Sequence, residues 1–192
     1  PDNKEMVNVI IDVDKKEKVK VHKITIEGNS ALTAKKIKST MKKTNEKNKL
    51  LNIFKTKKFI NDKYEEDKQN IIDKYNELGY RDAQIVVDSV YPFDENTVDI
   101  YMKIDEGSKY YLRNVTWVGN KLYSSDWMNQ QLRMKKGDVY NQKLLHERLT
   151  GDEDAIGNFY YNQGYIVAGI DPVEVNIDGD SIDLEMRVEE GF

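Results

Sequence analysis

The sequence contains a duplicated stretch whose residues predict the same structural change twice. Tyr75–Tyr80 and Tyr160–Tyr165 both read Tyr-x-x-x-Gly-Tyr. The first Tyr fits the buried face of a helix one turn from its end. The Gly fits the left-handed position that follows a helix, where a Cβ is costly, and the second Tyr opens a strand. One such stretch is a common helix stop, but two with matching flanks indicate a repeated structural unit.

The flanking segments repeat as well. Ile24–Asn29 matches Val115–Asn120, and both predict a strand that ends in Gly-Asn. Val98–Gly107 matches Ile182–Gly191, and both predict a strand that ends in Glu-Gly. The repeat therefore covers a whole folding unit rather than one helix end.

The start of the chain fits the same pattern. Val7–Asp14 matches Val98–Asp105 at an offset of 91 residues, the offset that also relates the two Gly-Asn pairs. Residues 1–16 are therefore predicted to be the last strand of a preceding repeat. Residues 17–107 and 108–192 are predicted to be two complete units.

Hydrophobic spacing predicts the same five elements in each unit, in the order strand, helix, helix, strand, strand. They span residues 19–27, 34–43, 62–78, 83–90 and 97–105, and then 110–118, 127–134, 142–163, 166–177 and 182–188. The last two strands suit a hairpin, and the first strand suits a crossover beside the last. We therefore predict an α+β fold of two tandem units. Each is a three-stranded mixed sheet in the order first–third–second, covered on one face by two helices.

Composition excludes several kinds of chemistry. The 192 residues include no cysteine, which excludes disulfides, cysteine zinc sites and thiol catalysis. The two histidines, His22 and His146, occupy non-equivalent places, so surface or packing roles are favoured. Glu65–Asp67 and Asp152–Asp154 are expected on exposed helix faces, where they aid solvation. No phosphate-binding glycine loop or nucleophile elbow is present, and no cofactor or metal is expected.

The predicted strand order leaves the middle strand of each unit at a sheet edge. Half of its backbone groups would be unpaired, and Pro92 and Asp171-Pro172 would help to blunt the edge. Such an edge can accept an extended partner segment by β-augmentation. The candidate partner-binding residues flank these edges: Ile85, Val87 and Ser89 in the first unit, and Val173, Val175 and Ile177 in the second.

Lysines gather in one segment of the first unit. Lys35–Lys58 holds ten Lys and one acid, Glu46. The favoured interpretation is a solvated helix face and a linker, with Leu50–Phe54 as a docked turn. The alternative is contact with a partner or an anionic membrane surface. The lysines available for such contact are Lys35, Lys36, Lys42, Lys43, Lys55, Lys57 and Lys58. No Gly-x-x-Gly loop lies between the helices, so nucleic-acid binding is not expected.

In their order and duplication, these motifs resemble the POTRA repeats of the BamA family of outer-membrane β-barrel assembly factors. Gly137–Asn141, followed by Leu145, Arg148-Leu149 and Ile156, is also similar to the BamA pattern between the two helices. The first unit departs from this pattern in its longer, Lys-rich interhelical linker.

The resemblance implies a periplasmic, non-enzymatic scaffold. Its implied partners are unfolded outer-membrane proteins, accessory lipoproteins of the assembly complex, and an outer-membrane β-barrel in the same full-length chain, which would tether the scaffold to the outer membrane. Two alternatives stay open. One is the POTRA module of a two-partner secretion transporter or another barrel-linked relative, and the other is a membrane-surface adaptor that uses Lys35–Lys58.

Overall fold

The computed structural model describes residues 19–47 and 57–191. The predicted opening strand and the Leu50–Phe54 turn lie outside the described residues. The chain divides into two compact units, one formed by residues up to 72 with 84–106 and the other by residues 73–83 with 107 onward. The domain boundaries given above stay predictions.

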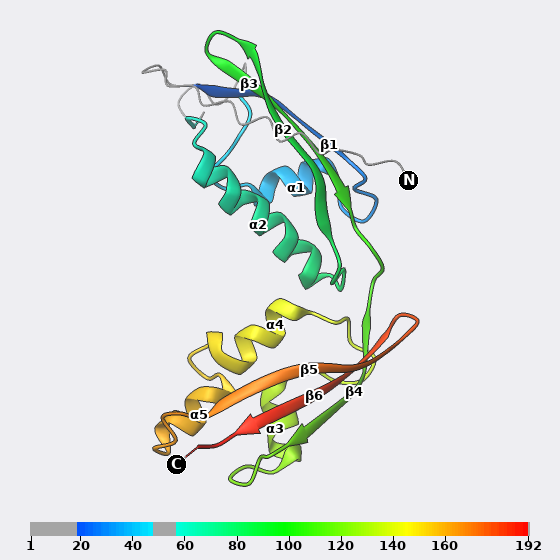
Figure 1. Ribbon diagram of the computed structural model, residues 1–192, viewed down its shortest axis with the longest axis vertical. Helices are drawn as coiled ribbons and strands as arrows, with labels where there is room; N and C mark the ends of the chain where they lie inside the picture. Colours follow the sequence, from blue (N-terminus) through cyan, green and yellow to red (C-terminus); the bar gives the residue numbers. More distant parts are fainter. Residues whose placement is uncertain (1–18, 48–56, 192) are drawn as a thin grey trace, which may run out of the picture. The chain divides into compact units, whose positions relative to one another are not determined.

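The first sheet has the predicted order. Its elements are β1 (Lys20–Glu27), α1 (Ala34–Thr40), α2 (Asn61–Glu77), β2 (Gln84–Asp94) and β3 (Thr97–Asp105). The strand order is β1-β3-β2, with β1 parallel and β2 antiparallel to the central β3. Both helices lie on one face of this sheet (Figure 1).

The second sheet repeats this topology. Its elements are β4 (Tyr111–Val118), α3 (Ser125–Leu132), α4 (Gln142–His146), the π-helical turn η1 (Glu147–Gly151), α5 (Ile156–Asn162), β5 (Gly169–Asp178) and β6 (Ser181–Glu189). The strand order is β4-β6-β5, again with one parallel and one antiparallel pair. The predicted α+β fold of two mixed three-stranded sheets is therefore confirmed.

The core of each unit lies between the sheet and its helices. Strand β6 alternates buried and less buried residues along its length, as a half-buried strand should. Its buried side chains pack against the helices and against Leu112 of β4. The buried cluster contains Met128, Leu132, Leu145, Leu149, Ile156, Tyr160, Ile182, Leu184, Met186 and Val188.

The two Tyr-x-x-x-Gly-Tyr stretches are helix stops, as predicted, but the second Tyr of each begins a turn rather than a strand, because β2 begins at Gln84 and β5 at Gly169. The Tyr80 N–H donates to the Tyr75 carbonyl at 3.0 Å, and the Tyr165 N–H donates to the Tyr160 carbonyl at 3.0 Å. The intervening glycines have φ of +92° and +90°, which is the left-handed geometry of a Schellman motif. In both copies the two tyrosine rings meet edge to face.

The glycine of each Gly-Asn pair lies directly against the central strand. Gly28 and Gly119 have φ of +80° and +88°. A Cβ on Gly28 would lie 2.0 Å from the Ile104 carbonyl oxygen, and one on Gly119 would lie 2.2 Å from the Val188 carbonyl oxygen. Only glycine fits this crossing, which explains why the motif recurs.

The glutamate of each Glu-Gly pair caps the loop that follows Gly-Asn. The Glu106 carboxylate accepts the Ala31 N–H at 2.9 and 3.1 Å. The Glu190 carboxylate accepts the N–H groups of Lys121 and Leu122 at 2.6 and 2.7 Å, and these bonds hold the pKa of Glu190 below its usual range. Tyr160 Oη donates to the same carboxylate at 3.2 Å. The repeated motifs are therefore structural and meet at one end of the sheet.

The predicted helix over 142–163 is interrupted. The chain leaves helical geometry at Asp152, where φ is -84° and ψ is 157°, and re-enters it at Ile156. Gly151 and the two aspartates that follow favour such a break, because Gly adds backbone freedom and Asp side chains compete for local hydrogen bonds. The consequence is a short loop whose acidic groups point back toward the helix.

Candidate partner-binding edges

The middle strands lie at the sheet edges, as the predicted strand order requires. In the described part of the chain, β2 pairs only with β3 and β5 pairs only with β6. The opposite edges are partly covered by the chain itself. Lys20 and Val21 of β1 form bridges with Lys58 and Glu46, and Tyr111 of β4 forms a bridge with Val139.

Strand β2 presents apolar side chains beside its open edge. Ile85 is half-buried, whereas Val87 and Ser89 are exposed, with 39% of Val87 accessible to solvent. The pairing register shifts between Ile85 and Val87 and again between Pro92 and Asp94. Each shift leaves an extra residue in β2, which is the pattern of a β-bulge.

Pro92 lies within β2, so the predicted end of the strand at Tyr91-Pro92 is wrong. The strand continues to Asp94. Proline has no N–H to give to a ladder and is tolerated mainly on edge strands. The position of Pro92 therefore agrees with the open edge.

Strand β5 has the same features. Val173 is half-buried, and Val175 and Ile177 are 48% and 45% exposed. The register shifts between Glu174 and Asn176, so Val175 is the extra residue. Within each unit, the candidate residues thus lie on an edge strand, as the pattern predicts. Their role in binding stays a prediction.

A buried tyrosine fixes a carboxylate of each edge strand. Tyr64 Oη donates to Asp88 of β2 at 2.5 Å, and Tyr140 Oη donates to Glu174 of β5 at 2.9 Å. Burial raises the pKa of both tyrosines, and the neighbouring carboxylate adds to the effect. Both hydroxyls therefore stay protonated and act as donors. These bonds hold the edge strands against the rest of their units, so the edges are presented in a fixed conformation.

The basic segment is partly neutralised within the first unit. Lys43 pairs with Glu66, and Lys57 Nζ donates to the Lys42 carbonyl. Lys35 and Lys36 are exposed on α1. Lys58 takes part in the backbone bridge to β1, and Lys55 lies outside the described residues. Anion binding by this segment stays a prediction.

One residue of the first acidic cluster does not act as a solvating group. Asp67 is 0% exposed. Its carboxylate accepts the Thr44 N–H at 2.5 Å and the Lys43 N–H at 3.0 Å. The exposed role predicted for Asp67 is therefore wrong, because this carboxylate ties α2 to the chain that follows α1.

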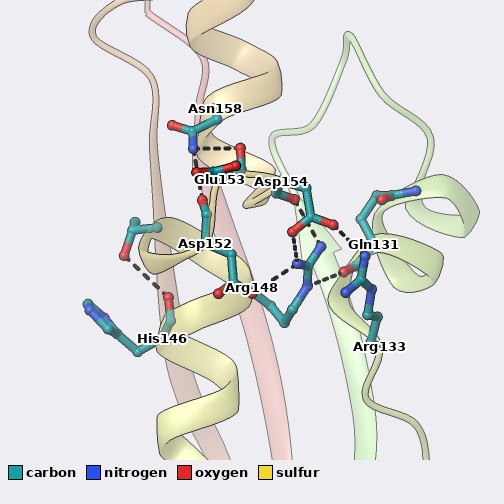
Figure 2. Close-up of polar contacts among 9 residues, drawn as sticks. Gln131, Arg133, His146, Arg148, Asp152, Glu153, Asp154 and Asn158 are labelled. Carbon is teal, nitrogen blue, oxygen red and sulfur yellow. Dashed lines mark hydrogen bonds and ion pairs between the residues drawn. The ribbon is translucent and has the colours of Figure 1, made fainter.

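Asp152 and Asp154 are 39% and 50% exposed, as predicted, but they lie in a loop rather than on a helix face, and both also pair with a buried arginine. Figure 2 shows both carboxylates converging on Arg148, whose side chain is 1% exposed. Arg148 Nη1 lies 3.1 Å from Asp152 Oδ2 and 2.6 Å from Asp154 Oδ1. The guanidinium holds the pKa of Asp154 below its usual range.

The remaining donors of Arg148 reach backbone oxygens. Nε donates to the Gln131 carbonyl at 2.8 Å and Nη2 to the Asp154 carbonyl at 2.9 Å. This fork joins α3, η1 and the loop before α5 (Figure 2). The sequence offered one signal for it, an Arg followed by Asp residues four and six positions later.

Residues 19–47 and 57–191 contain no group of three or more His, Asp or Glu side chains that could hold a metal ion. No helix in the same residues is long and apolar enough to cross a membrane.

The chain is similar to several known proteins. A protein of Treponema pallidum (strain Nichols) is 27% identical over 150 residues, which is 76% of this chain and 17% of the relative. The outer membrane protein assembly factor BamA of Buchnera aphidicola (subsp. Acyrthosiphon pisum, strain APS) is 22% identical over 188 residues, which is 98% of this chain and 28% of BamA. The chain thus spans less than a third of the length of these relatives.

A solved structure shows the same fold. The crystal structure of Haemophilus influenzae BamA POTRA3-5 superposes with a TM-score of 0.69 and 24% identity, covering 91% of this chain and 67% of that one. The POTRA family model, described as surface antigen variable number repeat, matches residues 19–107 and 110–191. The chain therefore belongs to the POTRA family, and its two units are POTRA repeats similar to those of BamA proteins.

Proposed function

We propose that this chain is part of the periplasmic scaffold of an outer-membrane β-barrel assembly protein, and that β2 and β5 bind unfolded client proteins by strand addition. Relatives that are named outer membrane protein assembly factors support the first part. Accessory lipoproteins of the assembly complex and an outer-membrane β-barrel in the same full-length protein are the other proposed partners.

The observation that carries the proposal is the combination of an open edge and exposed apolar side chains. Each of the two strands pairs on one side only within the described residues. Val87 on β2 and Val175 and Ile177 on β5 are exposed beside the edge. In strand addition, the backbone supplies hydrogen bonds for any sequence, and alternate side chains find apolar contacts. That combination suits client proteins that share a pattern of alternating apolar residues in their strands rather than a common sequence.

The bulges give these edges a second property. They interrupt the regular ladder and increase the local twist, which discourages pairing between two copies of the same edge. A client segment that arrives unfolded can adapt to an irregular edge, whereas another rigid edge cannot. The edges are therefore suited to transient binding of flexible chains.

The test is site-specific photo-crosslinking in cells that produce the full-length protein. A photoreactive amino acid at Val87 or Ile177 should form adducts with outer-membrane proteins in transit. The matched controls are Lys103 and Arg187, which are exposed on the central strands β3 and β6. Equal adducts from central and edge positions, or none from the edges, would refute strand addition.

A charged substitution at the edge should reduce client binding without destabilising the unit. Val175→Lys places a lysine at an exposed bulge, where it should change the free energy of unfolding by less than about 0.5 kcal/mol. Lysine on an edge strand opposes pairing, so adducts from Ile177 should fall severalfold. If Val175→Lys left the adducts unchanged, β5 would not be the binding edge.

A further inference from the structure

An open groove lies beside β4 in the second unit. Its volume is about 630 Å³. Residues of β4 and of α3 with the loop after it line most of the groove, and Asp183 and Leu184 of β6 and Val175 of β5 complete the lining. The lining that matters here is Val115, Thr116, Asn129, Gln130, Lys135 and Lys136. The edge of β4 is distinct from the edge of β5, which lies on the opposite side of β6, although Val175 of β5 also reaches the groove.

In the first unit, a carboxylate lies beside the corresponding edge. Glu46 forms a bridge with Val21 of β1, and its Oε1 accepts the Ile24 N–H at 2.7 Å. The same oxygen lies 2.6 Å from Lys38 Nζ on α1. One carboxylate therefore satisfies an edge N–H and pairs with a lysine of the covering helix.

The repeat identifies the equivalent positions in the second unit. Ile24 pairs with Ile100, and Val115 pairs with Leu184, in each case after one register shift. Because the Ile24 N–H points out of its sheet to Glu46, the shared register places the Val115 N–H on the outer side of β4.

The residue in the place of Glu46 is a lysine. The Lys47 N–H donates to the Val21 carbonyl, and the Gly137 N–H donates to the matching Leu112 carbonyl. The residues that precede these donors are Glu46 and Lys136. The carboxylate of the first unit is thus replaced by an ammonium group in the second.

This replacement reverses the chemistry of the groove. The Lys136 side chain has no acceptor to offer the Val115 N–H. Within residues 107–191, none of the hydrogen bonds gives that N–H an acceptor outside the sheet. Lys135 and Lys136 add two cations to the same groove. The position that holds a carboxylate in one unit is therefore polar, cationic and open in the other.

We propose that this groove binds an extended segment of a partner protein through an aspartate or glutamate side chain. The carboxylate would accept the Val115 N–H and pair with Lys136, as Glu46 accepts the Ile24 N–H and pairs with Lys38. The first unit shows that a carboxylate fits beside an edge of this geometry. The inference rests on the comparison of the two units and not on the proposed function of β2 and β5.

The test is an NMR titration of the ¹⁵N-labelled chain with two peptides. One is acetyl-Thr-Val-Glu-Val-Thr-amide, and the other has Gln in place of Glu. The Glu peptide should shift the Val115 amide and bind at least tenfold more tightly than the Gln peptide. Lys136→Glu should abolish binding and move the Val115 amide without peptide, because its own carboxylate then resembles Glu46. Lys136→Gln should weaken binding without that shift.

The matched control is Lys23→Glu, which makes the same charge change on an exposed residue of β1 in the first unit. It should leave binding to the groove unchanged. Equal binding of the two peptides, no binding of either, or shifts confined to β5 would overturn the proposal. Equal loss in Lys23→Glu and Lys136→Glu would also overturn it, since a general charge effect would then suffice.

Discussion

Removal of the Arg148 side chain should destabilise the second unit strongly. Arg148 is the largest of the fully buried side chains in the described residues, and it makes four hydrogen bonds to two carboxylates and two backbone carbonyls. Arg148→Ala removes all four and leaves a cavity between α3 and η1. The backbone carbonyls of Gln131 and Asp154 then lose their guanidinium donors.

The loss of stability depends on the carboxylates and carbonyls that remain after Arg148 is removed. Removing one partner of a buried ion pair typically costs about 3–5 kcal/mol, because an uncompensated charge stays behind. Here the carboxylates left behind are 39% and 50% exposed, so water can solvate them. We therefore expect about 3 kcal/mol for Arg148→Ala. Arg148→Met keeps most of the volume and should cost about 2 kcal/mol, chiefly from the two carbonyls.

Tryptophan fluorescence isolates the unit concerned. The chain has two tryptophans, Trp117 and Trp127, and both lie in the second unit. Urea unfolding followed by their fluorescence gives the free energy of that unit. The control is Arg187→Ala, which breaks an exposed pair with Glu185 and should cost less than about 0.5 kcal/mol. If Arg148→Ala cost no more than this control, the fork would not be a structural clamp.

Two further perturbations test the scaffold. Gly119→Ala should cost about 3 kcal/mol, because φ is positive and the new Cβ would lie 2.2 Å from the Val188 carbonyl oxygen; Gly169→Ala, where a Cβ meets nothing within 4 Å, is the control in the same fluorescence assay. Arg113 Nε and Nη2 lie 2.9 and 2.8 Å from the Asp183 carboxylate and lower its pKa from 3.8 to about 2. This pair should stabilise the unit above pH 3.8 and lose that contribution as the pH falls to about 2. Arg113→Gln should show a smaller loss over this range, and an equal loss would assign the acid sensitivity to other groups.

The strand order could be derived from the sequence because it depends on local signals and one topological rule. A two-residue turn at Glu95-Asn96 fixes the hairpin of β2 and β3. A helical connection before the hairpin then favours a parallel crossover onto its last strand. The repeat supplied an independent check, since the same pattern reappears from Tyr111 onward. The open edges follow directly from this order.

The buried polar contacts of Asp67 and Asp154 could not be derived in the same way, because their partners lie far away in the sequence or across a loop. Asp67 falls three residues after Tyr64 and four before Ile71, so helical spacing places it on the buried face of α2. That spacing was a usable signal. The donors to Asp67 are the N–H groups of Lys43 and Thr44. Their positions depend on the path of the chain after α1, which helical spacing does not describe. Asp154 depends in the same way on a break in the helix that Gly151 permits but does not require.

Comparison of the two units distinguishes residues that hold the fold together from residues that could recognise a partner. The motifs that repeat, such as the glycine under the central strand and the glutamate that caps the loop, make the same contacts in both copies. His22 of β1 corresponds to Arg113 of β4, and each pairs with the equivalent aspartate, Asp99 or Asp183, so this contact is also kept. Beside the same edge, Glu46 corresponds to Lys136, and there the charge is reversed. A fold that keeps its internal bonds and reverses a charge beside an edge can vary what it binds. The differences between the repeats are therefore the places where partner preference should be sought.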